Sequence, residues 1–339
     1  MTAPLRAGVI GLGMMGRHHA RVLRGLDGVE LVAVADAAGD RMSAAQGVPV
    51  VGSVDELLEF GIDMAVIATP TATHEELGLR LAAAGVHALI EKPVAVDATA
   101  AARLVDAFEA AGLVGAVGHI ERYNAALQAL RSRLDVGELG DVFQIATRRQ
   151  GPFPHRVADV GVVKDLATHD IDATSWIARS AYASVSAQSC TKSGRPHEDL
   201  VSVSGRLEDG TVTSHLVNWL TPFKERVLVV TGVRGAFVAD MLTADLTFHE
   251  NGTVQTDWEQ VSAFRGVAEG ASTRFAIPKR EPLVLEHEAF RDAVLGRRDD
   301  IVTLADGMRT VAVADQVIAS ARTGNTAYIR PTAAQGAAA

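Results

Sequence analysis

The sequence is poor in cysteine, in excess positive charge and in long apolar runs. Its single cysteine, Cys190, excludes an intramolecular disulfide and fits a reducing compartment. Lys and Arg number 32 against 41 Asp and Glu, and this net charge of −9 argues against a nucleic-acid partner. No apolar run approaches the roughly 20 residues that cross a bilayer, so we expect no membrane partner and a cytoplasmic protein.

The chain of 339 residues is long for one hydrophobic core, so we expect two domains. Before residue 120, short apolar runs alternate with helical patterns, which is typical of βαβ units and a parallel sheet. Later runs alternate apolar with polar residues between Asp-Gly, Arg-Gly and Asn-Gly pairs, which predicts an antiparallel sheet. We therefore predict an α/β domain with a doubly wound sheet over 1–120. An α+β domain with an open, mostly antiparallel sheet follows over 121–330, and its final helices pack back on the first domain.

The stretch "VIGLGMMG" carries a G-x-G-x-x-G motif between a predicted strand and a predicted helix. Gly11 permits a tight turn, Gly13 lets the backbone approach a pyrophosphate, and Gly16 lets the helix pack closely on the strand. Met14 and Met15 lie within the same turn, whose helix start favours phosphate. The motif predicts a dinucleotide site of the Rossmann type.

Asp36 ends the second predicted strand, 20 residues after Gly16. A carboxylate there can hold the ribose hydroxyls of NAD and repels the 2′-phosphate of NADP, so NAD is the expected cofactor. Arg17 and Arg41 are close enough in sequence to leave NADP open as an alternative.

Two further stretches carry chemistry. Lys92 lies in "EKP", directly after the fifth strand, at the edge where doubly wound sheets bind ligands. In "DLATHDID", Asp165, His169 and Asp172 are spaced so that a helix would present all three on one face. That face could hold a metal, transfer protons, or be merely structural. We expect no metal, because a metal site would leave the dinucleotide motif and Lys92 unexplained.

The order of these motifs, with "ATPTATHEE" between them, resembles the glucose-fructose oxidoreductase/inositol dehydrogenase/MocA (Gfo/Idh/MocA) family over nearly the whole chain. The resemblance implies a homodimer or homotetramer, with contacts through the faces of the second sheet. It implies that Lys92 contacts the nicotinamide ribose and the reacting substrate oxygen, and that Asp165 and His169 form the catalytic D-x-x-x-H pair. It also implies a lining for the nicotinamide end of the cofactor, made by Thr69, Pro70, His74 and Glu91.

In this assignment His169 exchanges a proton with the substrate hydroxyl, since histidine titrates near neutrality. Asp165 fixes its tautomer or helps to bind substrate, and Lys92 stabilises developing alkoxide charge. Asp172 is the member of the stretch that we expect to be structural.

Other stretches, such as "GHIERYNAAL" and "REPLVLEHEAF", look like the branch that contains UDP-N-acetylglucosamine 3-dehydrogenases. This implies oxidation at C3 of a nucleotide-linked sugar. Residues after the sixth strand should border the cleft: His119, Glu121, Arg122, Tyr123 and Asn124. Guanidinium and imidazole groups that could meet a diphosphate are Arg148, Arg149, His155 and Arg156. Only Gly161 precedes the catalytic aspartate where many relatives have two glycines, and the role of Lys164 stays open.

Two rival functions remain. One is the same chemistry on inositol or a free monosaccharide, which would need no nucleotide part in the substrate. The other is a non-catalytic dinucleotide sensor, in which loss of Lys92 or His169 would be expected, yet both are present.

Overall fold

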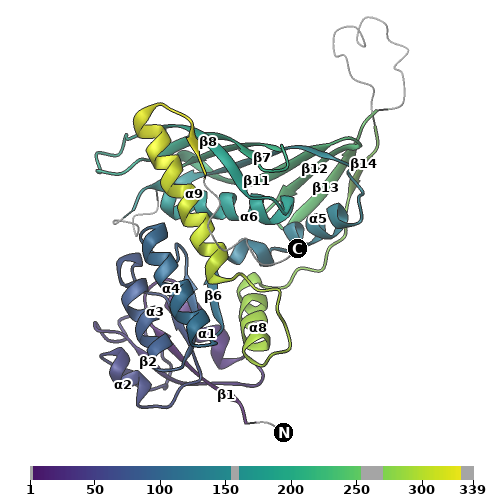
Figure 1. The fold of residues 1–339 in the computed structure, drawn as a ribbon. Helices are drawn as coiled ribbons and strands as arrows, with labels where there is room; N and C mark the ends of the chain where they lie inside the picture. Colours follow the sequence, from purple (N-terminus) through teal and green to yellow (C-terminus); the bar gives the residue numbers. More distant parts are fainter. Residues whose placement is uncertain (1–2, 154–159, 253–269, 330–339) are drawn as a thin grey trace, which may run out of the picture. The chain divides into compact units, whose positions relative to one another are not determined.

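The computed structural model describes residues 3–153, 160–252 and 270–329. The chain forms two compact units. Unit 1 comprises residues 1–120 and 280–315, and unit 2 comprises residues 121–279 and 316–339. The chain therefore returns to unit 1 at Arg280 and leaves it again within the last long helix, α9 (Figure 1).

Unit 1 is built on a six-stranded, all-parallel sheet in the order β3-β2-β1-β4-β5-β6. Its strands are β1 (Leu5–Ile10), β2 (Val29–Ala35), β3 (Val50–Val51), β4 (Met64–Ile67), β5 (His87–Glu91) and β6 (Gly115–Gly118). Its helices are α1 (Gly16–Arg24), α2 (Val54–Leu58), the 3₁₀ turn η1 (Thr71–Thr73), α3 (His74–Ala83), α4 (Ala98–Ala110), α8 (Pro282–Val294) and the first part of α9 (Leu304–Thr323). This strand order is that of dinucleotide-binding doubly wound sheets.

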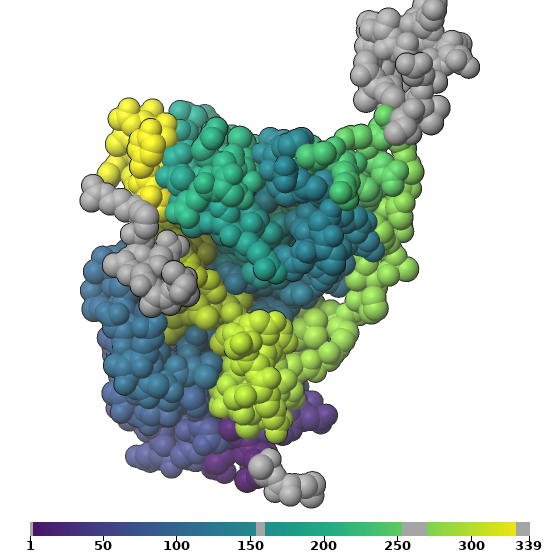
Figure 2. All heavy atoms as spheres, turned by 45° about the vertical axis from the view of Figure 1, so that its right-hand side comes forward, coloured from purple at the N-terminus to yellow at the C-terminus, as the bar shows by residue number. Residues whose placement is uncertain are grey.

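Local sequence explains these elements. The central strands are continuous apolar runs because helices cover both faces of a parallel sheet. Ser53 and Asp97 accept backbone N–H bonds at the starts of α2 and α4. Phe290 of α8 is 1% exposed and packs into the core formed by α1 and the sheet. Figure 2 shows α8 at the surface of unit 1, next to the N-terminal segment.

Unit 2 contains a nine-stranded sheet in the order β14-β13-β12-β11-β7-β10-β9-β8-β15. Its strands are β7 (Val142–Pro152), β8 (Tyr182–Cys190), β9 (Leu200–Leu207), β10 (Val212–Asn218), β11 (Leu220–Gly232), β12 (Gly235–Asp240), β13 (Asp245–Glu250), β14 (Ser272–Arg274) and β15 (Ala327–Tyr328). Its helices are the 3₁₀ turn η2 (Ile120–Tyr123), α5 (Ala125–Asp135), the π-helical turn η3 (Val163–Ala167), α6 (Thr168–Ala178) and the end of α9. All neighbouring strands are antiparallel except β7 and β10.

Helices α5 and α6 cover one face of this sheet (Figure 1). Residues of that face alternate along each strand, and the buried set on β11 includes Leu228 and Val230. They pack against Leu127 of α5 and Ile177 of α6. The face toward the helices, called here the helix face, therefore carries the core of unit 2.

The predicted fold class is confirmed: a parallel Rossmann sheet is joined to an open, mostly antiparallel sheet. The short strands β3, β14 and β15 carry too few residues for a periodic signal, and β12 was not predicted either. No helix in the described part of the chain is both long and apolar enough to cross a bilayer.

Candidate active site

The glycine motif forms the turn between β1 and α1. Gly11 has a φ of +91°, and a Cβ there would stand 2.8 Å from the Ala68 carbonyl oxygen. A Cβ on Gly16 would stand 1.8 Å from the Gly11 oxygen, so only glycine allows this packing. Nothing lies within 4 Å of the Cβ position at Gly13, which leaves open space above the turn. These are the features that a pyrophosphate needs.

Helix α1 starts beside this open space. Met15 is its N-cap residue, Met14 is 42% exposed, and the first turn contains no acidic residue. The positive end of the helix dipole therefore favours an anion. Both methionines lie where the sequence placed them, in the cofactor turn.

Asp36 follows β2 at the same edge of the sheet. Its Oδ2 accepts the N–H of Leu12 at 2.7 Å, and its Oδ1 accepts the N–H of Ala38 at 2.8 Å. These bonds hold the carboxylate next to the glycine turn, with lone pairs left for ribose hydroxyls. Unit 1 therefore fits NAD by its own geometry.

Thr69 and Pro70 follow β4 and are partly or fully exposed, beside Gly11. His74, which was expected to line the cofactor site as well, is buried. It is 1% exposed, and its Nδ1 and Nε2 lie 2.9 Å from the carbonyl oxygens of Pro93 and Thr69. Burial lowers the pKa of His74, although the two carbonyls oppose this. Since both nitrogens are occupied, His74 joins two loops and does not line the cofactor site.

Lys92 is half-buried in the turn that follows β5. Its backbone N–H donates to Oε2 of Glu91 at 3.1 Å, and Oε1 of Glu91 accepts Nε2–H of His19 at 2.9 Å. Glu91 is 8% exposed, and its bond to the Lys92 backbone supports the lysine turn. Burial alone would raise the pKa of Glu91, but His19 and Lys92 lower it overall.

Behind Glu91 lies a chain of buried titratable groups. Nδ1 of His19 is 2.9 Å from Nε2 of His287, and Glu286 adjoins the pair with no hydrogen bond to any described residue. Burial, followed by the charge of Glu91, raises the pKa of Glu286 well above its usual value. Burial and then His19 lower the pKa of His287 well below its own. We call Glu91, His19, His287 and Glu286 the unit 1 cluster.

Asp165 and His169 lie in unit 2 on a helix that changes its pitch between them. Asp165 belongs to the π-helical turn η3 and is 5% exposed, whereas His169 belongs to α6 and is half-buried. The sequence predicted one regular α-helical face, and this spacing is altered by the π turn. Such turns are frequent at functional sites. Lys164 is half-buried within the same turn.

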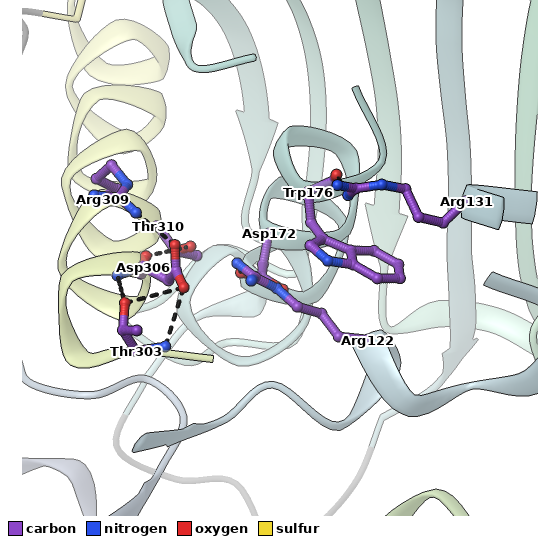
Figure 3. Close-up of polar contacts among 8 residues, drawn as sticks. All are labelled: Arg122, Arg131, Asp172, Trp176, Thr303, Asp306, Arg309 and Thr310. Atoms are coloured by element: carbon purple, nitrogen blue, oxygen red, sulfur yellow. Dashed lines mark hydrogen bonds and ion pairs between the residues drawn. The ribbon is translucent and has the colours of Figure 1, made fainter. Parts of the chain in front are cut away.

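Asp172 has a structural partner. Its carboxylate accepts Nε–H of Arg122 at 2.9 Å and Nη2–H at 2.6 Å, in a bidentate pair (Figure 3). Asp172 is 1% exposed. Both of its oxygens are therefore engaged, and no group of three or more metal-ligating side chains occurs in the described ranges.

Arg149 does not reach the surface of unit 2. It is 1% exposed, and its guanidinium donates to Glu121 and Asp170 at 2.9 Å each. Burial alone would lower the pKa of Arg149, but the two carboxylates outweigh it and raise the pKa. The expectation that Arg149 meets a diphosphate is wrong. We call Arg149, Glu121 and Asp170 the unit 2 cluster.

Two residues expected to bind substrate have other places. Arg148 alternates with Arg149 on β7, so it projects from the face opposite α6, where it pairs with Glu225 at 2.8 Å. It cannot share a site with His169 on α6. Asn124 caps α5 by accepting the N–H of Ala126, and it donates to the Met241 carbonyl at 3.0 Å. Its polar groups are thus engaged within the unit.

Of the other residues expected at the cleft, Tyr123 is 7% exposed and lies in unit 2, and His119 is 1% exposed and lies in unit 1. His155 and Arg156 lie outside the described residues.

Arg226 is a candidate residue that the sequence did not single out. It lies opposite Arg149 in the ladder of β11 and β7, so it projects from the helix face. Its side chain is 40% exposed, with Nη1 3.8 Å from Oε1 of Glu121. Burial and the charge of Arg149 lower the pKa of Arg226, and the charge of Asp165 counteracts this. Arg226 lies two residues before buried Leu228 on the same strand, and this spacing could have placed it on the helix face.

Comparison with known proteins agrees with this geometry. Residues 5–119 match the Gfo/Idh/MocA oxidoreductase family, described as an NAD-binding Rossmann fold. Residues 127–238 match the C-terminal domain of the same family. The chain therefore belongs to the Gfo/Idh/MocA oxidoreductases, and its unit 1 is an NAD-binding domain.

Among individual relatives, the chain is 29% identical to UDP-N-acetylglucosamine 3-dehydrogenase of Acidithiobacillus ferrooxidans, over 92% of this chain and 96% of that protein. A solved structure of that enzyme has a TM-score of 0.84 at 28% identity, over 94% and 98% of the two chains. Inositol 2-dehydrogenase 2 of Saccharopolyspora erythraea is 28% identical over 96% and 95%. GenD2 from gentamicin A biosynthesis, solved with NAD, has a TM-score of 0.81 at 25% identity, over 98% of each chain.

Proposed function

We propose that this protein is an NAD-dependent dehydrogenase that oxidises a secondary hydroxyl of a sugar, at C3 of a UDP-N-acetylhexosamine-type nucleotide sugar. The observation that carries the proposal is that each unit contains one part of the residue set that this chemistry needs. Unit 1 has a cofactor turn with Lys92 at the same sheet edge, and unit 2 has Asp165 and His169 on one helix. Similarity to the A. ferrooxidans enzyme along both units supports the choice of substrate.

In the proposed reaction His169 accepts the proton of the substrate hydroxyl, and Asp165 orients the imidazole. The ammonium group of Lys92 stabilises the negative charge that develops on the same oxygen. Bound NAD supplies the acceptor for the hydride. In the reverse direction, the same residues return the proton to a ketone.

The bias toward NAD comes from Asp36, whose carboxylate is fixed by two backbone N–H groups beside the turn. A 2′-phosphate would meet this charge and be repelled. Arg41 is exposed and donates to the Ala38 carbonyl at 3.3 Å, so it is the residue through which NADP would be accepted instead.

For the anionic part of a nucleotide sugar, Arg226 takes the place that the sequence gave to Arg148 and Arg149. It projects from the helix face, its side chain is 40% exposed, and its Nη1 lies 3.8 Å from Oε1 of Glu121. A guanidinium donates two parallel bonds to a phosphate or carboxylate.

An inositol or free-monosaccharide dehydrogenase is the alternative, and the similarity to inositol 2-dehydrogenase 2 along both units favours it. A homodimer or homotetramer is proposed as well, through the face of the unit 2 sheet opposite α5 and α6. That face carries partly exposed Val227, Val229 and Leu216.

The test is the absorbance of reduced nicotinamide after NAD is mixed with UDP-N-acetylglucosamine, the matching uronic acid or myo-inositol. Reduction with a UDP-sugar alone supports the proposal, and reduction with inositol alone replaces it by the alternative. His169→Ala and Lys92→Ala should lower kcat by about 10²–10⁴ with NAD affinity retained. His249→Ala, at an exposed histidine of β13, is the control and should retain activity. Asp36→Ala should weaken NAD binding and relax the bias against NADP.

A further inference from the structure

The helix that carries Asp165 and His169 is fastened at its start by one distant residue. The N–H of Val162 donates to the backbone oxygen of Glu198 at 3.0 Å, and the N–H of Val163 donates to its Oε1 at 3.0 Å. The first N–H groups of a helix lack partners within the helix. Glu198 satisfies two of them from the loop between β8 and β9.

Gly161 makes this contact possible. A Cβ on Gly161 would stand 2.1 Å from Oε1 of Glu198, so any larger residue would displace the carboxylate. The Gly161 oxygen accepts the N–H of Asp165 at 3.1 Å. Gly161 therefore lies between Glu198 and Asp165, which explains why glycine occupies this position of the motif.

The loop that presents Glu198 is itself braced. The carboxylate of Asp199 accepts the N–H groups of Lys192 and Ser193 at 2.6 and 2.8 Å. The backbone oxygen of Asp199 accepts the N–H of Trp219 at 2.9 Å. Asp199 is fully buried, so the loop that ends in Glu198 is tied to the sheet.

We propose that Glu198 is a positioning residue, which holds the π-helical turn so that Asp165 and His169 keep the relative placement that proton transfer requires. The inference rests on the proposed function. Its physical basis is that a carboxylate at a helix start stabilises that start through hydrogen bonds and the helix dipole. Misplacement of a catalytic group by about 1 Å can lower a rate about a hundredfold.

The experiment compares Glu198→Ala, Glu198→Gln and Glu198→Met with wild type, with the sugar on which wild type is active. Ala and Met remove the acceptor, and Met fills the same space if Ala prevents folding. Both should lower kcat by about tenfold to a hundredfold while the Kd for NAD stays unchanged. Gln keeps an acceptor and should recover kcat to within about fivefold of wild type. Glu208→Ala, at an exposed position after β9, is the matched control.

Gly161→Ala supplies a second arm. In the wild-type background the new methyl group displaces Glu198 and should lower kcat as Glu198→Ala does. Combined with Glu198→Ala it should add less than about twofold, because the group it collides with is gone. Additive losses, or a kcat of Glu198→Ala and Glu198→Met within twofold of wild type, would overturn the proposal.

Hydrogen exchange separates this inference from the proposed function. Amides 162–169 should exchange faster in Glu198→Ala than in wild type, whereas the later part of α6 should not change. If none of the sugars allows wild type to reduce NAD, the proposed function fails. The hydrogen-exchange experiment then still decides whether Glu198 holds the turn. Unchanged exchange at 162–169 counts against the proposal.

Discussion

Each unit supports its candidate site residues with a buried polar cluster, and the two clusters use different chemistry. Behind Lys92, the unit 1 cluster consists of two carboxyl groups and two imidazoles. Beneath α6, the unit 2 cluster consists of one guanidinium shared by two carboxylates. The first has several groups that gain or lose protons, whereas an arginine stays charged at every pH that the fold survives.

The two clusters differ in the interactions that hold the neighbouring site residues in place. In unit 1 the lysine turn is held through Glu91 by histidine bonds that depend on where the protons lie. In unit 2 the cluster is held by Coulomb attraction between groups paired at 2.9 Å. We therefore expect the unit 1 cluster to be sensitive to pH and the unit 2 cluster to be sensitive to loss of a partner.

The largest effect is expected from Arg149→Met. It leaves Glu121 and Asp170 buried without their cation and should cost about 3–5 kcal/mol of unfolding free energy. The tryptophans in the described ranges, Trp176 and Trp219, belong to unit 2, so tryptophan fluorescence during urea unfolding reports this unit. Arg148→Met on the same strand, where the side chain is 58% exposed, is the control and should cost less than about 1 kcal/mol. Equal losses in the two variants would contradict the described cluster.

His215 provides the next effect, since it is a titrating group of unit 2 outside the cluster. It bonds to Thr147 and Tyr182 at 2.8 and 2.7 Å, and burial lowers its pKa to about 4. Below pH 6.5 the unfolded chain therefore binds a proton at His215 that the folded chain does not bind. The free energy of unfolding consequently falls as the pH falls toward 4. The loss should reach about 3 kcal/mol, and His215→Gln should abolish it.

The free energy of unfolding is measured by tryptophan fluorescence in urea between pH 4 and 7. At neutral pH the values for wild type and His215→Gln should differ only by a constant offset. Parallel pH dependence of the two proteins would show that His215 is not the acid-labile group.

Glu286→Gln tests the unit 1 cluster. The raised pKa of Glu286 means that the folded state keeps a proton that the unfolded state loses above the usual carboxyl range, so wild type loses stability as the pH rises. Glutamine resembles the protonated acid and cannot lose a proton. As the pH rises, the free energy of unfolding of the variant should increase relative to that of wild type by about 1.4 kcal/mol per pH unit, until the pH passes the pKa of Glu286 in the folded state.

Hydrogen exchange in peptides from β5 and α8 measures this gain, because unit 1 contains no tryptophan. Glu288→Gln is the control on the same helix, at a partly exposed pair with Arg280. Its difference from wild type should stay within about 1 kcal/mol and should not grow with pH. A flat difference for Glu286→Gln as well would mean that Glu286 is ionised in the fold.

The sequence predicted most where local chemistry decides structure. The turn at Gly11, Gly13 and Gly16 and the carboxylate at Asp36 follow from motifs a few residues long. The faces of β7 were within reach too, since alternation places Arg149 with buried Ile145 and Arg148 opposite. Their shared charge alone had suggested a common ligand for the two arginines.

What could not be predicted depends on contacts between distant segments. Glu198 lies 35 residues after Val163, and nothing in its surroundings marks it as a helix partner. His19 and His287 are separated by 268 residues, yet they form one bond. The π-helical turn that contains Asp165 has no sequence signature that we could identify.

The smallest effect is expected from the ion pair of Arg122 and Asp172. It extends the comparison to a pair with one partly exposed partner. Arg122 and Asp172 form two parallel bonds, with the side chain of Arg122 13% exposed (Figure 3). Arg122→Lys keeps the charge and loses the second bond, so it should cost about 1 kcal/mol. Since the pair lies in unit 2 and contains no imidazole, this cost should be constant between pH 6 and pH 9 in the fluorescence assay, within about 0.5 kcal/mol. A cost equal to that of Arg149→Met would place Arg122 and Asp172 within the unit 2 cluster, and a cost that changes with pH would reveal a titrating neighbour.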